Sequence, residues 1–249
     1  MNNTRAYEMA LLSEQAYFTP EEFAKAHTDG NFRFHSKEGT QFYTVWTDDE
    51  LMFVFRGTEV SEFADLKADL QFQLLPIGTE GSVHKGFWTA LDVVWEDVVA
   101  DYNELCEERH VVFTGHSLGA ALATLAMSKL DLRTAELYTF GSPRVGDDIF
   151  RVTFHYRFRH VYRFRNQNDI VTRHPMAIWD YRHVGKCYYF TGAGNCLENP
   201  GFWVRFKQFI IGMYRGAAIK KVDSFRDHSV ANYVKLTRGL PSCSPKEPT

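Results

Sequence analysis

The stretch that decides the fold is HVVFTGHSLGAALATLA, residues His110 to Ala126. Its first half is dominated by β-branched and aromatic residues and predicts a short buried strand, whereas the alanine-rich second half predicts a helix. Between them stands Gly-His-Ser-Leu-Gly, which matches the Gly-x-Ser-x-Gly pattern of a strand–turn–helix nucleophile elbow. Ser117 is therefore either a catalytic nucleophile or a small residue buried in a tight turn.

The neighbours of Ser117 fit the first interpretation. A serine on such a sharp turn needs very small residues two positions before and after it, and Gly115 and Gly119 stand there. The serine then lies at the positive N-terminal end of the helix, where the backbone N–H of Leu118 can donate to a developing oxyanion.

The rest of the chain alternates strand-like and helix-like segments, which favours one α/β domain with a mostly parallel central sheet. We expect this domain to span residues 1–240 and the Pro-rich residues 241–249 to form a flexible tail. Apolar spacing and turn residues predict helices at 4–16, 86–109, 118–129 and 200–216, and strands within 39–59, 110–115, 135–146, 160–171 and 180–190.

Composition excludes several classes of protein. The 249 residues are 45% hydrophobic and 24% charged, with a net charge of −3, so there is no basic field to attract nucleic acid. No apolar stretch approaches the length of a transmembrane helix. No signal peptide is visible at the start, so we expect a cytoplasmic protein, export by a non-classical route, or secretion with a leader absent from this sequence. The oligomeric state stays open.

The four cysteines do not form a disulfide scaffold in a chain of this length, and their spacing does not indicate a metal site. Cys187 and Cys196 flank a segment that reads as a hairpin with a glycine-rich turn. A disulfide across this hairpin and two free thiols remain equal alternatives.

A serine nucleophile requires a base and a carboxylate that orients it, and in the elbow fold they follow the serine in the order acid, histidine. Asp169 follows a predicted strand, where the loop at its carboxyl end can carry a catalytic residue. His228 stands just before the last predicted helix. Spacing alone leaves the other acids and histidines open: Asp131, Asp147, Asp148, Asp180, Asp223, Asp227, Glu136, Glu198, His155, His160, His174 and His183.

An ordered series of motifs resembles the class 3 lipases, the fungal-type triacylglycerol hydrolases with the α/β-hydrolase fold. The motifs span residues 40 to 236: FVFRGTE, DLKADLQF, VHKGFWTAL, VFTGHSLGAALATLA, YTFGSPRVGD, YRFRNQNDIVTRHP, YRHVGKCYYF and DHSVANYV. The resemblance implies a mostly parallel sheet with helices on both faces and a short lid after the oxyanion-hole strand.

The resemblance also assigns roles. It makes Ser117 the nucleophile, Asp169 the triad acid and His228 the base, with the backbone amides of Thr58 and Leu118 as the oxyanion hole. His116 and His84 belong to the motifs, and we expect both to be structural. The implied chemistry uses no metal and no cofactor.

Two segments bear on the substrate. Residues 59–64, EVSEFA, occupy the lid position and carry two glutamates and one large apolar residue, so we expect a small, partly polar lid and weak or absent interfacial activation. The segment 200–216 is basic and aromatic and reads either as a membrane-surface helix or as a helix packed on the core.

The expected function is a serine carboxylic-ester hydrolase that acts on acylglycerols, with a lipid or other ester as its partner, in some settings at a lipid–water interface. A phospholipase A1 or a feruloyl-type esterase would use the same machinery, and a catalytically silent lipid-binding protein is the alternative from another class. The motifs do not determine the acyl chain length.

Overall fold

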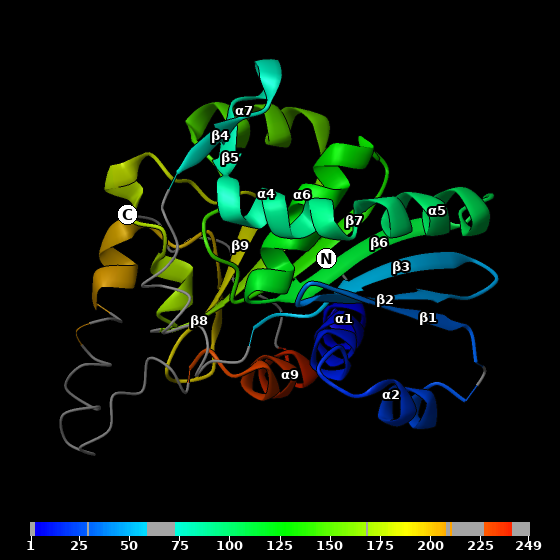
Figure 1. Ribbon diagram of the computed structural model, residues 1–249. Coiled ribbons are helices and arrows are strands. Elements are labelled where there is room, and N and C mark those ends of the chain that lie inside the picture. Colours follow the sequence, from blue (N-terminus) through cyan, green and yellow to red (C-terminus); the bar gives the residue numbers. More distant parts are fainter. Residues whose placement is uncertain are drawn as a thin grey trace.

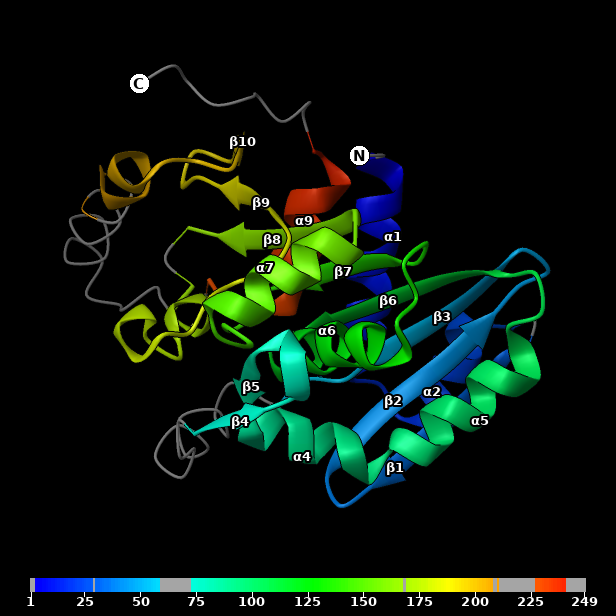
Figure 2. The same ribbon diagram turned by 90° about the horizontal axis from the view of Figure 1, so that it is seen from above.

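The computed structural model describes residues 3–28, 30–58, 73–167, 169–207, 210 and 227–240. Its centre is an eight-stranded sheet in the order β1-β2-β3-β6-β7-β8-β9-β10 (Figures 1 and 2). The five strands β3, β6, β7, β8 and β9 pair in parallel, and β1, β2 and β10 add antiparallel edges. The strands are β1 Phe32–Lys37, β2 Thr40–Trp46, β3 Glu50–Phe55, β6 His110–His116, β7 Glu136–Phe140, β8 His160–Asn166, β9 Lys186–Phe190 and β10 Cys196–Glu198.

Helices cover both faces of this sheet. Figure 1 shows α4 (Lys85–Val93), α5 (Trp95–Leu105), α6 (Leu118–Leu130) and α7 (Asp148–Arg157) above it. Below it lie α1 (Asn3–Gln15), α2 (Pro20–Ala26) and α9 (Val230–Arg238). This arrangement is the α/β-hydrolase fold expected from the sequence.

The strand β3 shows why two helical layers are needed. Its residues Leu51, Phe53 and Phe55 belong to the core beneath α4 and α6, whereas Met52 and Val54 belong to the core against α1. Alternate side chains of a strand point to opposite faces, so a run that is apolar at every position must be covered on both sides.

The predicted helix at 86–109 is wrong in one respect, because it is two helices. The chain breaks at Val94, whose backbone (φ −110°, ψ 8°) ends α4 and begins α5. Leu91, Val94 and Val98 are all buried and keep helical spacing across the break, so the apolar pattern does not reveal it.

The predicted helix 4–16 is confirmed as α1, but a second helix follows it. Thr19 caps α2 in a reciprocal capping box with Glu22, and Pro20 takes the first helical position. The structure also has α7, β1 and the small hairpin of β4 (Leu74–Pro76) and β5 (Ser82–His84), which the sequence patterns did not indicate.

The cysteine alternatives are both wrong. The hairpin itself exists, since Cys196 of β10 pairs with Phe190 of β9. Cys187 and Cys106 are free, and Cys196 is disulfide-bonded. The bond therefore does not close the hairpin.

Two expectations lie wholly or partly outside the described residues. The expected lid at 59–64 lies outside them, as does the expected tail at 241–249. Of the expected helix 200–216, residues 202–207 are helical, and most of the rest is outside the described part. Within the described residues, no helix combines the length and apolar character needed to cross a membrane.

Candidate active site

Ser117 lies at the sharp turn between β6 and α6. Its backbone has φ 58° and ψ −126°, a region that costs a non-glycine residue about 1–3 kcal/mol. A Cβ atom at Gly115 would lie 2.5 Å from the backbone of Gly119, and one at Gly119 would lie 2.1 Å from the carbonyl oxygen of Phe55. Both glycines are thus required by close approach of the backbone, and the strained turn is held in place by packing.

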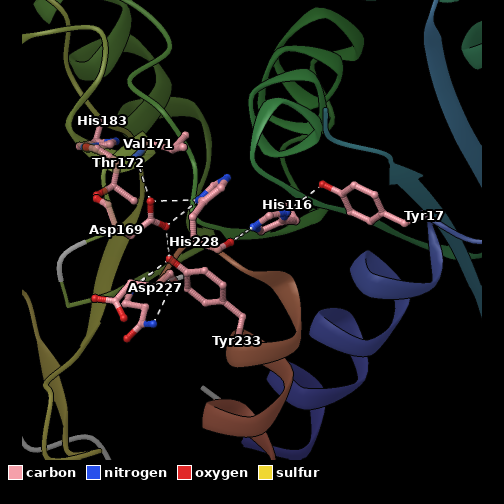
Figure 3. Close-up of polar contacts among 10 residues, drawn as sticks. Tyr17, His116, Asp169, Val171, Thr172, His183, Asp227, His228 and Tyr233 are labelled. Atoms are coloured by element: carbon pink, nitrogen blue, oxygen red, sulfur yellow. Dashed lines mark hydrogen bonds and ion pairs between the residues drawn. The ribbon is translucent and has the colours of Figure 1, made fainter. Parts of the chain in front are cut away.

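Asp169 and His228 form a fully buried pair (Figure 3). Asp169 follows the carboxyl end of β8, as Ser117 follows that of β6. The Nδ1 atom of His228 lies 2.9 Å and 3.0 Å from the two carboxylate oxygens of Asp169. A carboxylate only accepts hydrogen bonds, so Nδ1 carries the proton and Nε2 has the lone pair in the neutral ring.

Asp169 receives two further hydrogen bonds. The hydroxyl of Tyr233 donates to Oδ2 at 2.6 Å, and the backbone N–H of Val171 donates to Oδ1 at 2.9 Å. Burial alone raises the pKa of Asp169, but the adjacent His228 and the hydrogen bonds from His228 and Tyr233 outweigh it and hold this pKa below its ordinary value. The carboxylate therefore stays ionised in spite of its burial.

The backbone around His228 is held from two sides. The side-chain amide of Asn166 donates to the carbonyl oxygen of Asp227 at 2.9 Å, and the ring Nε2 of His116 lies 2.6 Å from the carbonyl oxygen of His228. The backbone N–H of Asn166 also donates to the hydroxyl of Tyr233 at 2.9 Å. Asn166, at the end of β8, thereby positions both the backbone before His228 and Tyr233, whose hydroxyl donates to Asp169.

His116, next to Ser117, is a neutral link in this arrangement. Its Nε2 must donate, because the carbonyl of His228 only accepts, so Nδ1 accepts from the Tyr17 hydroxyl 2.9 Å away. Burial, followed by the charge of His228, lowers the pKa of His116 to about 3. A neutral ring with both nitrogens engaged has a structural role.

Thr58 and Leu118 lie on either side of the turn. Thr58 follows β3, and Leu118 is the first residue of α6, where backbone N–H groups have no partner within the helix. Both residues line a pocket of about 220 Å³, and Thr58 also lines a second pocket of about 230 Å³ together with His116 and Ser229. A Cβ atom at Gly57 would lie 3.1 Å from the Cβ of Ser117, so the backbone before Thr58 packs directly on the elbow.

The hydroxyl of Ser117 is buried and makes no hydrogen bond to a described residue. Such contacts are often long in structures without substrate and shorten in the complex. The five predicted site residues thus lie after the ends of β3, β6 and β8, at the start of α6 and just before α9, with Asp169 and His228 in direct contact.

His84 is packed into the scaffold, apart from this pair. It is buried, its ring stacks on Phe87 at 4.0 Å, and its Nδ1 accepts from the N–H of Phe87 at the start of α4. Burial lowers its pKa to about 4, so the ring is neutral.

The sequence interpretation missed Tyr233, Asn166 and Tyr17. Tyr233 stands five residues after His228 in the motif DHSVANYV, which was the available signal. Asn166 and Tyr17 belong to distant segments, and only the fold brings them to the site.

Comparison with known proteins assigns the chain to a family. The family model "Lipase (class 3)" matches residues 52–179. The chain belongs to the class 3 lipase family. Among its curated relatives, a secreted mono- and diacylglycerol lipase of Fusarium solani is 37% identical over 120 residues, which are 45% of this chain and 35% of the relative. A lipase of Rhizomucor miehei is 35% identical over 158 residues, 57% of this chain and 42% of the relative.

The chain thus spans less than half the length of these curated relatives. Among solved structures, a triacylglycerol lipase whose catalytic centre is described as a serine protease triad aligns with a TM-score of 0.68 and 27% identity. This alignment covers 76% of the present chain and 80% of the other.

Proposed function

We propose that this protein is a serine carboxylic-ester hydrolase that cleaves acylglycerol esters, as a triacylglycerol lipase does. The observation that carries the proposal is the buried Asp169–His228 pair beside the strained Ser117 elbow. Burial of such a pair costs free energy, because the ionised carboxylate loses its contact with water. The pair has the geometry of a base that is oriented by an acid.

His228 would act as the general base. Its Nδ1–H points to Asp169, so the lone pair of Nε2 accepts the proton of Ser117 as the serine oxygen attacks the ester carbonyl. Asp169 keeps this tautomer and stabilises the imidazolium that forms. Because the pKa of Asp169 is held low, the proton stays on the histidine.

Thr58 and Leu118 would hold the oxyanion. The N–H of Leu118 opens α6, so the positive end of the helix adds to its effect. Removal of one such donor typically costs about 3 kcal/mol of transition-state stabilisation. We propose the backbone N–H of Thr58 as the second donor, with its hydroxyl as a third.

The reaction then has two halves. His228 gives its proton to the leaving alcohol as the C–O bond of the ester breaks, which leaves the acyl group on Ser117. A water molecule, deprotonated by His228, attacks this acyl-serine and releases the carboxylic acid.

The lipid nature of the substrate rests on the family, whose named members act on mono-, di- and triacylglycerols. We propose that residues 1–240 form one catalytic domain. The pockets on both sides of Thr58 are the places for the acyl and alcohol parts of a substrate.

Labelling with a fluorophosphonate probe tests the proposal. The wild-type protein and the Ser128→Ala variant should react, since Ser128 is another buried serine at the far end of α6. The Ser117→Ala variant should not react. Absence of labelling in a folded wild-type protein, judged by circular dichroism, favours the lipid-binding alternative. A panel of p-nitrophenyl esters, a triglyceride and a phospholipid then defines the substrate.

A further inference from the structure

Five arginines gather around β8 and the segments beside it, and none of them carries the proposed chemistry. Arg163 and Arg165 alternate along β8 with Phe164, so they share the sheet face of Val161. They lie opposite Cys187 and Tyr189 of β9, and the guanidinium of Arg165 lies 5.6 Å from the centre of the Tyr189 ring. Together with their electrostatic neighbours these residues are called the arginine cluster: Arg144, Arg163, Arg165, Arg173 and Arg205.

Four arginines of the cluster lack acidic partners within the described part of the chain. Among the described residues, Arg144, Arg163, Arg165 and Arg205 form no ion pair with a carboxylate. Arg163 is only 8% exposed, and the buried Nε atoms of Arg163 and Arg165 have no hydrogen-bond acceptor among the residues that the structure describes. A buried charge without a partner is strongly unfavourable, so the buried Arg163, with the half-buried Arg165 on the same face, favours the binding of an anion.

The neighbouring groups relieve the positive charge only in part. The guanidinium of Arg144 donates to the backbone carbonyls of Arg173 and Pro175, and the carboxylates of Asp169 and Asp227 act on Arg173. Burial, and then the other arginines, lower the pKa of Arg144 to about 10 and also lower the pKa of Arg205. His183 donates from Nε2 to the carbonyl of Thr172 at 2.8 Å, and burial followed by Arg163 and Arg144 lowers its pKa well below the ordinary value. The ring is therefore neutral, and its buried Nδ1 has no hydrogen-bond partner among the described residues.

The helix that carries Arg205 faces solvent with aromatic side chains. Phe202 is 63% exposed, Trp203 is 76% exposed and Phe206 is 45% exposed. Arg205 itself is half-buried, and exposed aromatic residues beside cations are typical of a surface that enters the headgroup layer of a membrane. The aromatic rings can enter the acyl boundary while the cations meet the phosphate layer.

We propose that the arginine cluster binds the phosphate group of an anionic phospholipid and so attaches the protein to a lipid surface. Guanidinium groups bind phosphate through paired N–H···O hydrogen bonds, and a phosphate presents enough oxygens for several arginines at once. The cluster adjoins the loop that carries Asp169, but none of its arginines has a role in the proposed hydrolysis.

Vesicle co-sedimentation tests the proposal with the Ser117→Ala protein, which leaves the vesicles intact. We expect binding to phosphatidylcholine vesicles that contain phosphatidylglycerol, and weaker binding when oleate supplies the same surface charge. The change Arg165→Gln with Arg205→Gln should weaken binding about tenfold or more. The control Arg159→Gln, an exposed arginine just before β8, should bind like the parent protein.

Thermal unfolding gives a second, independent readout. Inorganic phosphate should raise the Tm of the parent protein, and the double variant should lose this shift while its Tm without phosphate does not fall. Trp203→Ala should weaken vesicle binding and keep the phosphate shift. The proposal is overturned if the double variant binds vesicles as the parent does, or if phosphate shifts the Tm while no vesicle binds, which would assign the site to soluble phosphate.

Discussion

Two charged groups are buried near the carboxyl end of β8, and their surroundings are opposite. Asp169 receives hydrogen bonds from His228, Tyr233 and Val171, so its charge is fully compensated within the protein. Arg163, on the strand just before it, has no acceptor among the described residues. A buried charge that already has its hydrogen-bond partners can act in a reaction without rearrangement. A buried charge without partners instead favours the binding of a ligand of opposite charge.

The largest loss of activity is expected at Asp169, the buried charge that has its hydrogen-bond partners. Asp169→Asn keeps the shape of the residue but removes the charge that fixes the tautomer of His228, so kcat/KM for a soluble ester should fall about 10⁴-fold. Steady-state kinetics of the folded protein measure this loss. Asp101→Asn is the matched control, because Asp101 is also buried and bonded to Arg33, His35 and Thr44 but lies in α5. It should lower stability and leave kcat/KM unchanged; an equal loss of activity in both variants would contradict the assignment of Asp169.

The second prediction compares two arginines. Arg33 pairs with Asp101 and Glu104, and its side chain is 34% exposed, so Arg33→Met should destabilise the protein by about 2–3 kcal/mol after allowance for solvent screening. Arg163→Met replaces an uncompensated charge by an apolar side chain and should raise stability by about 1–2 kcal/mol in phosphate-free buffer. Urea unfolding measures both changes. If Arg163→Met destabilises as strongly as Arg33→Met, Arg163 is not an uncompensated charge.

Tyr233→Phe tests how much the tyrosine hydroxyl stabilises the Asp169 carboxylate. It removes one donor to Asp169 and leaves the backbone N–H of Asn166 without its acceptor, which should cost about 1–2 kcal/mol of stability and about tenfold in kcat/KM. The pKa of the Asp169 carboxyl should rise toward its ordinary value. Tyr162→Phe, a half-buried tyrosine on β8, should change neither quantity; equal effects of the two variants would show that the loss is one of packing.

The smallest effect concerns pH. The pKa of His116 is lowered in the folded protein, so the unfolded chain takes up a proton below about pH 6.5 that the folded protein does not. This group therefore contributes stability that is present above that pH and is lost as the pH falls toward 3. The slope for one proton is about 1.4 kcal/mol per pH unit. In His116→Gln, unfolding between pH 7 and 4 should show a shallower dependence, and an unchanged slope would contradict a buried neutral ring.

Much of the proposed site was accessible from the sequence because each motif carries its own local constraint. Gly115 and Gly119 mark the elbow, since only glycine fits the close backbone contacts there. The order serine, acid, histidine, together with the family motifs, selected Asp169 and His228 from the other acids and histidines.

The rest required three-dimensional information. The break at Val94 preserves the spacing of buried residues on both sides, so periodicity cannot show it. Tyr17 and Asn166 act through partners 99 and 61 residues away in the chain, and no local pattern encodes such contacts. The alternation of Arg163, Phe164 and Arg165 was visible, but only the packing of the surrounding described elements shows that none of them brings an acidic partner to Arg163 or Arg165.

Trapping of the acyl-enzyme shows whether Ser117 is the nucleophile. The protein is mixed with excess p-nitrophenyl butyrate, the reaction is quenched in acid, and the peptides are analysed by mass spectrometry. The account predicts a rapid burst of p-nitrophenol and a butyryl group on Ser117, which accumulates because the ester of a phenol acylates faster than water removes the acyl group. Turnover of the ester with the butyryl group on another residue, or with wild-type kinetics in Ser117→Ala, would contradict it.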